Sequence, residues 1–221
     1  MTHITLHHLE RSRSHRILWL LHELELPFDL VEYKRHPKTI RAPQSLREIH
    51  PLGKSPVVSI DSQVIAESGA IIETLVENTG KLGPEGQDER RWFRYWMHYA
   101  EGSLMPPLLV RLIFDQLRNA PLPFFLRPIP RAIANKVDGA FTQGEIDRNL
   151  AFLDDHLSSR AYFCSDRFTA ADIQMSYPVE AAVSRGRATV GLTNLRAWIG
   201  RIHQRPAYQK ALEQGGPILV G

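Results

Sequence analysis

Apolar and polar positions in the first 35 residues predict two strands separated by one amphipathic helix. The runs from Ile4 to Leu9 and from Phe28 to Tyr33 are typical of strands. Between them, Arg16 to Leu26 carries apolar residues at helical spacing and stops before Pro27. A strand, a helix and a strand of these lengths predict a right-handed βαβ unit with parallel strands.

The next segment predicts a hairpin followed by a helix. Val57 to Ile60 and Val64 to Ala66 are short β-prone runs on either side of the polar turn at Asp61, Ser62 and Gln63. A helix is expected from Ser68 to about Asn78, and a short exposed one from Leu46 to His50. Together these elements predict a small α/β sheet domain with thioredoxin-like architecture over residues 1–80.

The remaining chain predicts a second domain built from helices alone. Thr79 to Gln87 breaks every periodic pattern and is expected to be the interdomain linker. After it, Asp88 to Asp115 predicts a long helix that is interrupted or bent at Pro106-Pro107, and Arg131 to Leu157 predicts another. Two short helices are expected at Trp198–His203 and Ala207–Glu213. The all-helical domain is therefore assigned to residues 88–221.

Between the two long helices lies an apolar segment that is rich in proline. Its prolines are Pro121, Pro123, Pro128 and Pro130, and they surround Leu122, Phe124, Phe125, Leu126 and Ile129. We expect a non-helical connector here. A packed loop, a lid over a hydrophobic pocket and a contact with a membrane surface are the three interpretations left open.

A helix start is predicted near Phe168. Thr169 can cap the following helix, Asp172 can close the reciprocal capping box, and Phe168 can pack against Ile173. We assign this capping motif a structural role rather than a catalytic one. The neighbouring Cys164 is expected to be a buried apolar side chain rather than a catalyst.

Composition narrows the class of protein. The chain has 221 residues, 43% of them apolar, which suffices for two compact domains. Its single cysteine excludes an internal disulfide and a Cys-x-x-Cys centre. The first residues lack a secretion signal, and the longest strongly apolar run, Ile17 to Leu21, is too short to cross a bilayer. We therefore expect a cytoplasmic protein without a transmembrane segment.

Neither the net charge nor the histidine content predicts a nucleic-acid or metal site. The net charge of +3 comes from Lys and Arg residues scattered along the chain, which argues against nucleic acid as a partner. His7 and His8 point to opposite faces of a strand, and His98, His156 and His203 have no acidic or histidine partner at ligand spacing. No metal site is expected.

The most informative polar feature joins a proline turn to a helix start. The segment from His50 to Pro56 is followed eleven residues later by Glu67-Ser68, and the predicted hairpin returns these two residues toward the turn. A cis bond before Pro56 would point the backbone of Ser55 outward. A serine at a helix start can hold a carboxylate, and the adjacent glutamate can take an ammonium group. The pattern predicts a site for a small acidic peptide.

These residues, in this order and spacing, resemble the cytosolic glutathione transferases over nearly the whole chain. The resemblance rests on Ser12–Leu21, Ile49–Pro56, Ala66–Ser68 and Phe168–Asp172. It is greatest for a microbial and fungal subgroup that combines a Ser-Arg pair near the first helix with a His-Pro-Leu-Gly-Lys/Arg-Ser-Pro loop. The fold implied is a thioredoxin-like domain followed by an all-helical domain, and the resemblance also implies a homodimer.

The resemblance implies a set of glutathione-binding residues. Ser55 would pair through its backbone with the cysteinyl part, and Glu67 and Ser68 would hold the γ-glutamyl ammonium and carboxylate. Lys54 would lie near the glycyl end. Arg41 falls where the family often supplies a further cation, although a surface arginine explains it equally well.

The reactive group would be the thiol of glutathione, used as a co-substrate, with no metal involved. A serine hydroxyl near the first helix can stabilise the thiolate, and we assign this role to Ser12, with Ser14 as the second candidate or as the helix cap. Arg13 and Arg16 can add positive potential, and Arg16 can alternatively bind a carboxylate elsewhere in the fold. No tyrosine or cysteine lies between Leu9 and Arg16, which argues against the tyrosine-type and cysteine-type enzymes.

The expected function is a glutathione transferase whose thiolate attacks a small hydrophobic electrophile between the two domains. Trp92, Tyr95, Trp96, Tyr99 and Met105 can line that cleft, or can equally be core or subunit contacts. Two alternatives remain open. One is a glutathione-dependent peroxidase or disulfide reductase, and the other is a noncatalytic protein that uses the same fold for binding.

Overall fold

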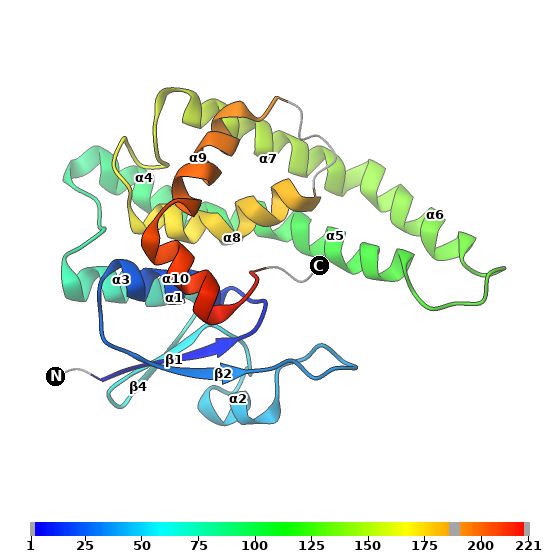
Figure 1. Ribbon diagram of the computed structural model, residues 1–221. Helices are drawn as coiled ribbons and strands as arrows, with labels where there is room; N and C mark the ends of the chain where they lie inside the picture. The colour runs from blue at the N-terminus through cyan, green and yellow to red at the C-terminus, as the bar shows by residue number, and fades with distance from the viewer. Residues whose placement is uncertain (1–2, 186–190, 219–221) are drawn as a thin grey trace.

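A mixed β-sheet forms one layer of the molecule in the computed structural model, which describes residues 3–185 and 191–218 (Figure 1). Strand β1 (Ile4–Leu9) pairs in parallel with β2 (Asp29–Tyr33) and antiparallel with β3 (Val57–Ile60). Strand β4 (Gln63–Ala66) follows β3 and completes the order β2-β1-β3-β4. The predicted βαβ unit and hairpin are both confirmed.

Helices α1 (Ser14–Glu23) and α3 (Ser68–Thr79) lie between the sheet and the rest of the protein (Figure 1). Helix α1 starts two residues earlier than its apolar spacing predicts, and it buries every residue from position 14 to position 21. The helix is buried on all sides because it packs between two layers, and its buried residues include the polar Ser14, His15 and Arg16. The short helix α2 (Gln44–Ile49) lies away from α1 and α3, at the bottom of the view.

Two long helical rods follow, and each is interrupted by one π-helical turn. The first rod consists of α4 (Gly86–Tyr99), η1 (Ala100–Leu104) and α5 (Met105–Arg118), and the second of α6 (Pro128–Val137), η2 (Asp138–Thr142) and α7 (Gln143–His156). The break predicted at Pro106-Pro107 thus takes the form of a π-helical turn just before the prolines, which lie in the first turn of α5. There the missing amide hydrogen of proline costs no helical hydrogen bond.

The connector between the rods is shorter than predicted. Pro128 and Pro130 belong to the first turn of α6, so the expectation of a non-helical segment up to residue 130 is wrong at its end. Proline is well suited to a first helical turn, and its fixed φ angle favours the helix there.

The last helices complete the helical domain. A 3₁₀ turn, η3 (Leu157–Ser159), ends the second rod, and α8 (Ala170–Arg185), α9 (Thr193–His203) and α10 (Pro206–Gly215) follow. Helix α8 packs on α1, α3, α4 and α7, and α10 packs along α1. These contacts hold the helical domain against the thioredoxin-like domain.

The capping box before α8 is present in one of its two halves. The Asp172 carboxylate accepts a hydrogen bond from the Thr169 amide at 3.0 Å, as predicted. The other half differs, because the Asp172 amide donates to the backbone carbonyl of Thr169 and the Thr169 hydroxyl donates to Asp172 or to Cys164. Asp172 also accepts from the Phe163 amide and from Trp198 Nε1. The residue therefore joins three segments of the helical domain.

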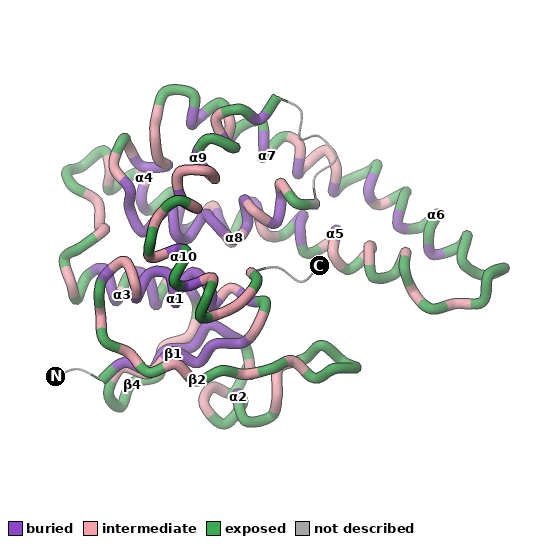
Figure 2. Tube along the Cα trace, in the orientation of Figure 1, coloured by how far each residue is buried: buried purple, intermediate pink, exposed green. Residues whose placement is uncertain are grey.

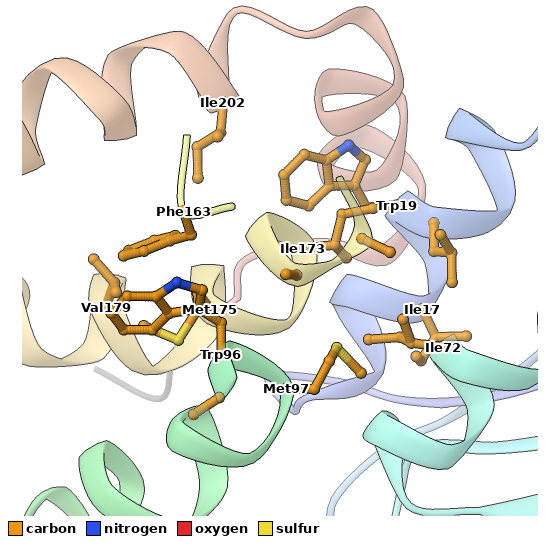
Figure 3. Close-up of a cluster of buried hydrophobic side chains, with 14 of the residues drawn as sticks. Ile17, Trp19, Ile72, Trp96, Met97, Phe163, Ile173, Met175, Val179 and Ile202 are labelled. Carbon is orange, nitrogen blue, oxygen red and sulfur yellow. The ribbon is translucent and has the colours of Figure 1, made fainter. Parts of the chain in front are cut away.

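One apolar core runs through both domains. Figure 3 shows Ile17 and Trp19 of α1 on one side of this core and Trp96 and Phe163 of the helical domain on the other. All four side chains are fully buried. Trp96 is thus a core residue, which settles the open alternative for this aromatic side chain. Figure 2 shows the same buried band between the sheet and the outer helices.

The architecture is a thioredoxin-like domain followed by an all-helical domain, in agreement with the sequence. Cys164 is free and buried, as predicted, and burial raises the pKa of its thiol to about 12. No helix among the described residues is long and apolar enough to cross a membrane.

Candidate functional site

The proline turn and the start of α3 meet at a small pocket, as the predicted hairpin requires. Both halves of the predicted peptide site contribute, together with one residue from the loop before α1. The pocket is lined by Arg13, His50, Leu52, Lys54, Ser55, Pro56, Ala66, Glu67 and Ser68. Lys54, Ser55, Glu67 and Ser68 are thus brought together, and Arg41 is not among the lining residues.

The turn from His50 to Pro56 has a defined backbone. Gly53 adopts a φ angle of 55°, and a Cβ atom there would lie 2.5 Å from Arg47 Cγ. Only glycine fits this conformation without strain. The peptide bond between Ser55 and Pro56 is cis. The Ser55 hydroxyl donates to the His7 carbonyl at 3.1 Å and accepts from the Leu9 amide at 3.3 Å, which anchors the turn on β1.

Glu67 lies in an unusual backbone conformation directly before α3. Its φ and ψ angles are 70° and 120°, a region that non-glycine residues rarely adopt. Such strain costs about 1–3 kcal/mol and is found most often at functional sites. The side chain is exposed at the pocket.

Ser68 does not cap α3, contrary to the prediction. It is the first residue of the helix, and Glu67 occupies the cap position without a side-chain cap hydrogen bond. The Ser68 hydroxyl instead accepts a hydrogen bond of 2.6 Å from Arg16 Nη2. Because a hydroxyl can accept and donate at once, Ser68 can still donate toward the pocket, next to the positive end of the helix dipole.

A buried arginine connects this site to the helical domain. The Arg16 side chain is 1% exposed, and its guanidinium contacts Ser68, the Gln174 carbonyl and the carboxylate of Glu101 in η1. Arg13 Nη1 forms a second ion pair with Glu101 at 2.6 Å. Burial alone would raise the pKa of Glu101, but the two guanidinium groups hold that pKa below its usual range. Of the roles considered for Arg16, the structure shows carboxylate binding.

Ser12 and Ser14 belong to one hydrogen-bonded chain. Ser12 Oγ lies 2.8 Å from Ser14 Oγ, and Ser14 Oγ lies 2.9 Å from His8 Nδ1. His8 Nε2 lies 3.0 Å from the Gly215 carbonyl and must therefore be the nitrogen that donates to it. Burial lowers the pKa of His8 and favours its neutral form. Ser12 Oγ also accepts from the Ser14 amide at 3.2 Å. Neither serine is the N-cap of α1, because Arg13 occupies that position without a side-chain cap hydrogen bond and Ser14 is the first residue of the helix.

The two serines differ in depth. Ser14 is fully buried, whereas Ser12 retains 6% exposure at the end of the loop after β1. Arg13, which follows Ser12, lines the pocket.

The two cations predicted for the glycyl end, Lys54 and Arg41, are both exposed. Lys54 lies at the pocket, and Arg41 lies in the loop before α2, where its backbone carbonyl accepts a hydrogen bond from the His36 amide. His7 and His8 lie on opposite faces of β1, with His7 contacting Tyr33 and Ser59. No group of three or more His, Cys, Asp or Glu side chains that would suit a metal ion occurs within residues 3–185 and 191–218.

The sequence did not identify the role of Glu101. This residue lies 85 positions after Arg16 in a helical rod, and nothing in its neighbourhood resembles a site motif. The link between His8 and Ser14 was also missed, because a strand residue and a helix start meet here only through the fold of the β1–α1 loop.

A larger hollow of about 1070 Å³ lies along the outward face of α4 and reaches η1. Its walls are basic and aromatic, and they consist of Gln87, Arg90, Arg91, Arg94, Tyr95, His98, Tyr99, Gly102 and Ser103. Tyr95, one of the aromatic residues for which cleft and core were both considered, is 41% exposed here. The hollow ends at Gly102 and Ser103, next to Glu101 in the chain.

Two family models match the chain. The N-terminal domain of glutathione S-transferase matches residues 12–78, and the C-terminal domain of glutathione S-transferase matches residues 114–201. The first match contains the complete pocket, and the second covers most of the helical domain.

Relatives named glutathione S-transferase align with this chain over nearly its whole length. Glutathione S-transferase 3 of Schizosaccharomyces pombe is 38% identical over 96% of this chain and 87% of its own length. Glutathione S-transferase 1 of Saccharomyces cerevisiae is 31% identical over 96% of this chain and 94% of its own length. The crystal structure of a glutathione S-transferase from Actinobacillus pleuropneumoniae superposes with a TM-score of 0.79 at 27% identity, covering 96% of this chain and 92% of that one.

Proposed function

This chain belongs to the glutathione S-transferase family, and we propose that it joins glutathione to apolar electrophiles through a thiolate stabilised by Ser12. The observation that carries the proposal is the meeting of Lys54, Ser55, Glu67 and Ser68 at one pocket that Arg13 also lines; Ser12 precedes Arg13 in the chain and is not itself a lining residue. Glutathione is the co-substrate, and the transfer itself needs no further cofactor.

The pocket supports one orientation of the tripeptide. The Glu67 carboxylate can take the γ-glutamyl ammonium, while the Ser68 hydroxyl and the free amides at the start of α3 can take the γ-glutamyl carboxylate. The hydroxyl of Ser55 is occupied by β1, so its backbone is the part that remains for the cysteinyl unit. Lys54 lies at the pocket for the glycyl carboxylate. Arg41 keeps its assignment as a further cation for that group, although it is outside the pocket.

Ser12 is suited to stabilise the thiolate because its proton can be redirected. Ser14 donates its own proton to the neutral His8, so the Ser12 hydroxyl is the donor in its bond to Ser14, and it can turn from Ser14 toward a sulfur anion. Lowering a thiol pKa by about two units corresponds to about 2.7 kcal/mol of preferential stabilisation of the anion. Arg13, at the same loop, adds positive potential.

The helical domain is proposed to hold the electrophile. The hollow on α4 supports this assignment, since its Gly102–Ser103 end adjoins Glu101, which contacts Arg13 at the glutathione pocket. Tyr95 offers an aromatic face there, and Arg91, which is not part of the second hollow, can pair with the nitro or carboxyl group of an aromatic electrophile.

We also propose a homodimer. Glu73 and Glu77 of α3 share a second hollow with Arg90 and Arg94 of α4, and none of these four side chains has an ion-pair partner within the described parts of the chain. A two-fold axis would bring the acidic half of this surface onto the basic half of the other copy. A cytoplasmic location is proposed as well, because a lone buried cysteine without a disulfide suits a reducing compartment.

A panel of three acceptors tests the reaction. The purified protein is assayed with glutathione and, in turn, a chloronitroaromatic, an organic hydroperoxide and a glutathione mixed disulfide. The proposal expects conjugation of the chloronitroaromatic to be the fastest of the three. Turnover of only the hydroperoxide or only the disulfide would contradict it, as would a protein that binds glutathione without turnover.

A further inference from the structure

The tip of the hairpin formed by α5 and α6 carries a cluster of exposed large apolar side chains. Phe124 is 79% exposed, Phe125 65% and Ile129 59%, and Leu126 and Ile133 belong to the same segment. The two phenylalanine rings contact each other edge to face. An apolar cluster of this kind on a protein surface usually marks an interaction site.

This tip extends away from the body of the protein. Figure 1 shows α5, the connector and the start of α6 reaching outward beyond the other elements, far from the sheet that bears the glutathione pocket. Figure 2 shows most residues of the connector and of the start of α6 as exposed, with Pro130 and Ala134 as the buried positions of α6. Within the described residues, the cluster is therefore not covered by another part of the chain.

Charge on the same segment has a single sign. Residues 116–137 contain Arg118, Arg127, Arg131 and Lys136 and no aspartate or glutamate. Arg131 and Lys136 are exposed and form no ion pair with any described residue, and Arg127 donates through Nε to the Leu122 carbonyl. Arg118 is paired at the base of the hairpin, so Arg127, Arg131 and Lys136 supply the positive charge on this segment that no described carboxylate neutralises.

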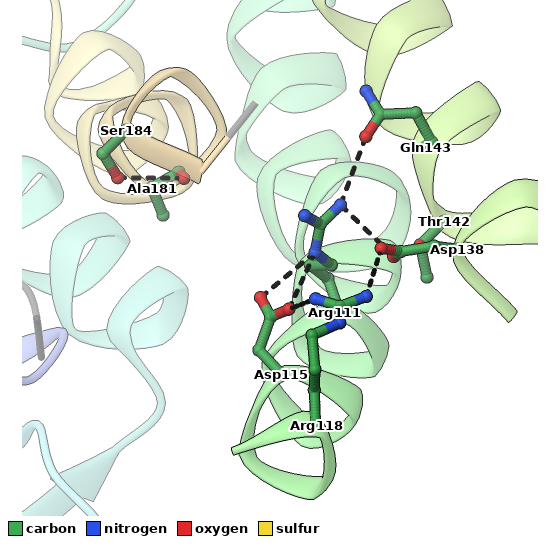
Figure 4. Close-up of polar contacts among 8 residues, drawn as sticks. All are labelled: Arg111, Asp115, Arg118, Asp138, Thr142, Gln143, Ala181 and Ser184. Carbon is green, nitrogen blue, oxygen red and sulfur yellow. Dashed lines mark hydrogen bonds and ion pairs between the residues drawn. The ribbon is translucent and has the colours of Figure 1, made fainter. Parts of the chain in front are cut away.

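The nearest carboxylates are used by a buried network at the base of the hairpin (Figure 4). Asp115 pairs with Arg111 and Arg118, and Asp138 pairs with the same two arginines at 3.2 and 2.7 Å. Thr142 donates to Asp138 at 2.6 Å. This network joins α5 to η2, so the hairpin has a fixed base and both nearby acids are neutralised.

We propose that the hairpin tip docks on an anionic lipid surface. Phe124, Phe125 and Ile129 would enter the headgroup region, while Arg131 and Lys136 would contact acidic headgroups. Aromatic and aliphatic side chains combined with flanking cations are the features by which proteins lie on such surfaces without spanning them. The inference is independent of the glutathione pocket and goes beyond the transfer reaction.

Charge favours lipid over a second copy of the chain as the occupant. Two tips meeting about a two-fold axis would bring equal positive charges together, and no carboxylate from residues 116–137 is available to offset them. An anionic lipid surface supplies the missing negative charge. Apolar electrophiles also concentrate in lipid, so docking would bring the enzyme close to them.

Vesicle sedimentation tests this proposal directly. The full-length protein should sediment with phosphatidylcholine vesicles that contain phosphatidylserine, bind pure phosphatidylcholine vesicles more weakly, and be released by salt. The double variant Phe124→Ser/Phe125→Ser should bind the anionic vesicles roughly tenfold more weakly or worse. The double variant Arg131→Glu/Lys136→Glu should also lose roughly tenfold or more.

A matched control tests whether vesicle binding depends on the tip or on any exposed phenylalanine. Phe141, 48% exposed in η2, lies behind the tip, and Phe141→Ser should bind vesicles like the unchanged protein. Light scattering follows the oligomeric state of every variant. The proposal is overturned if the unchanged protein does not bind anionic vesicles, or if Phe124→Ser/Phe125→Ser binds them as tightly as the unchanged protein. It is also overturned if that variant changes the oligomeric state and not vesicle binding.

Discussion

The hydroxyl oxygens of Ser12 and Ser14 lie 2.8 Å apart, so these two serines share one hydrogen bond although only Ser12 retains any exposure. Ser14 connects Ser12 to His8, and His8 is bound in turn to the end of α10. We propose different roles for the two serines: Ser14 stabilises the loop, and Ser12 contacts the thiol of glutathione.

Ser14→Ala is expected to reduce stability while retaining transferase activity. The change leaves His8 Nδ1 without its buried donor, which costs about 1–3 kcal/mol. Urea unfolding should show this loss, and turnover of a chloronitroaromatic should persist. Ser184→Ala serves as a control, because Ser184 makes one bond to the Ala181 carbonyl and is less buried. Loss of turnover in a folded Ser14→Ala protein would assign thiol activation to Ser14 instead.

Glu67→Gln should weaken glutathione binding. The substitution removes the negative charge opposite the γ-glutamyl ammonium, and a hydrogen bond to a charged group contributes about 1.5–3 kcal/mol, roughly tenfold to a hundredfold in affinity. Isothermal titration with glutathione measures the effect. Glu213→Gln on the exposed side of α10 is the matched control. Equal affinities of the two variants would remove Glu67 from the binding site.

Glu101→Gln should destabilise the contact between the two domains. Arg16 is buried and would keep its charge without a carboxylate partner, a change that costs about 3–5 kcal/mol. Chemical denaturation at neutral pH should show the loss. An unchanged unfolding midpoint would mean that the ion pairs of Glu101 with Arg13 and Arg16 do not stabilise the fold.

Glu101 should also make the stability of the protein depend on pH. Because the folded pKa of Glu101 lies below its usual value, its contribution is fully present above the unfolded pKa of about 4.3 and is lost as the pH falls through the folded pKa. The stability difference between the unchanged protein and Glu101→Gln should therefore shrink in acid below that value. A difference that stays constant down to the acid transition would contradict this assignment.

Charge reversal on α4 should dissociate the proposed dimer. Arg90→Glu/Arg94→Glu would place acidic groups opposite Glu73 and Glu77 of the other copy, and like charges at an interface cost several kcal/mol. Sedimentation velocity should show monomers, and adding Glu73→Arg and Glu77→Arg should restore the dimer. A monomeric unchanged protein, or a reversal without effect, would exclude this interface.

Local patterns in the sequence predicted the elements of the sheet domain well. The β-prone runs of β1, β3 and β4 and the apolar spacing of α1 each depend on near neighbours, and so does the turn from His50 to Pro56. The π-helical turns in the two rods were not predicted, because a one-residue widening of a helix leaves no periodic signal over so short a stretch.

The site was predictable to the extent that its residues lie in short motifs. Ser55, Glu67 and Ser68 came from such motifs, whereas the partners that hold them did not. Glu101 reaches Arg16 across 85 positions, and the use of Ser68 as an acceptor for Arg16 replaced the expected helix cap. These contacts depend on how the two domains pack, which no local pattern encodes.

The most direct measurement is an ultraviolet titration of glutathione bound to the unchanged protein and to Ser12→Ala, following thiolate absorbance. The free thiol has a pKa near that of cysteine, about 8.5. We expect bound glutathione to titrate about two units lower in the unchanged protein, and Ser12→Ala to bring the pKa back toward the free value. A thiol pKa that is unshifted in the unchanged protein, or equally lowered in Ser12→Ala, would contradict the assignment of Ser12.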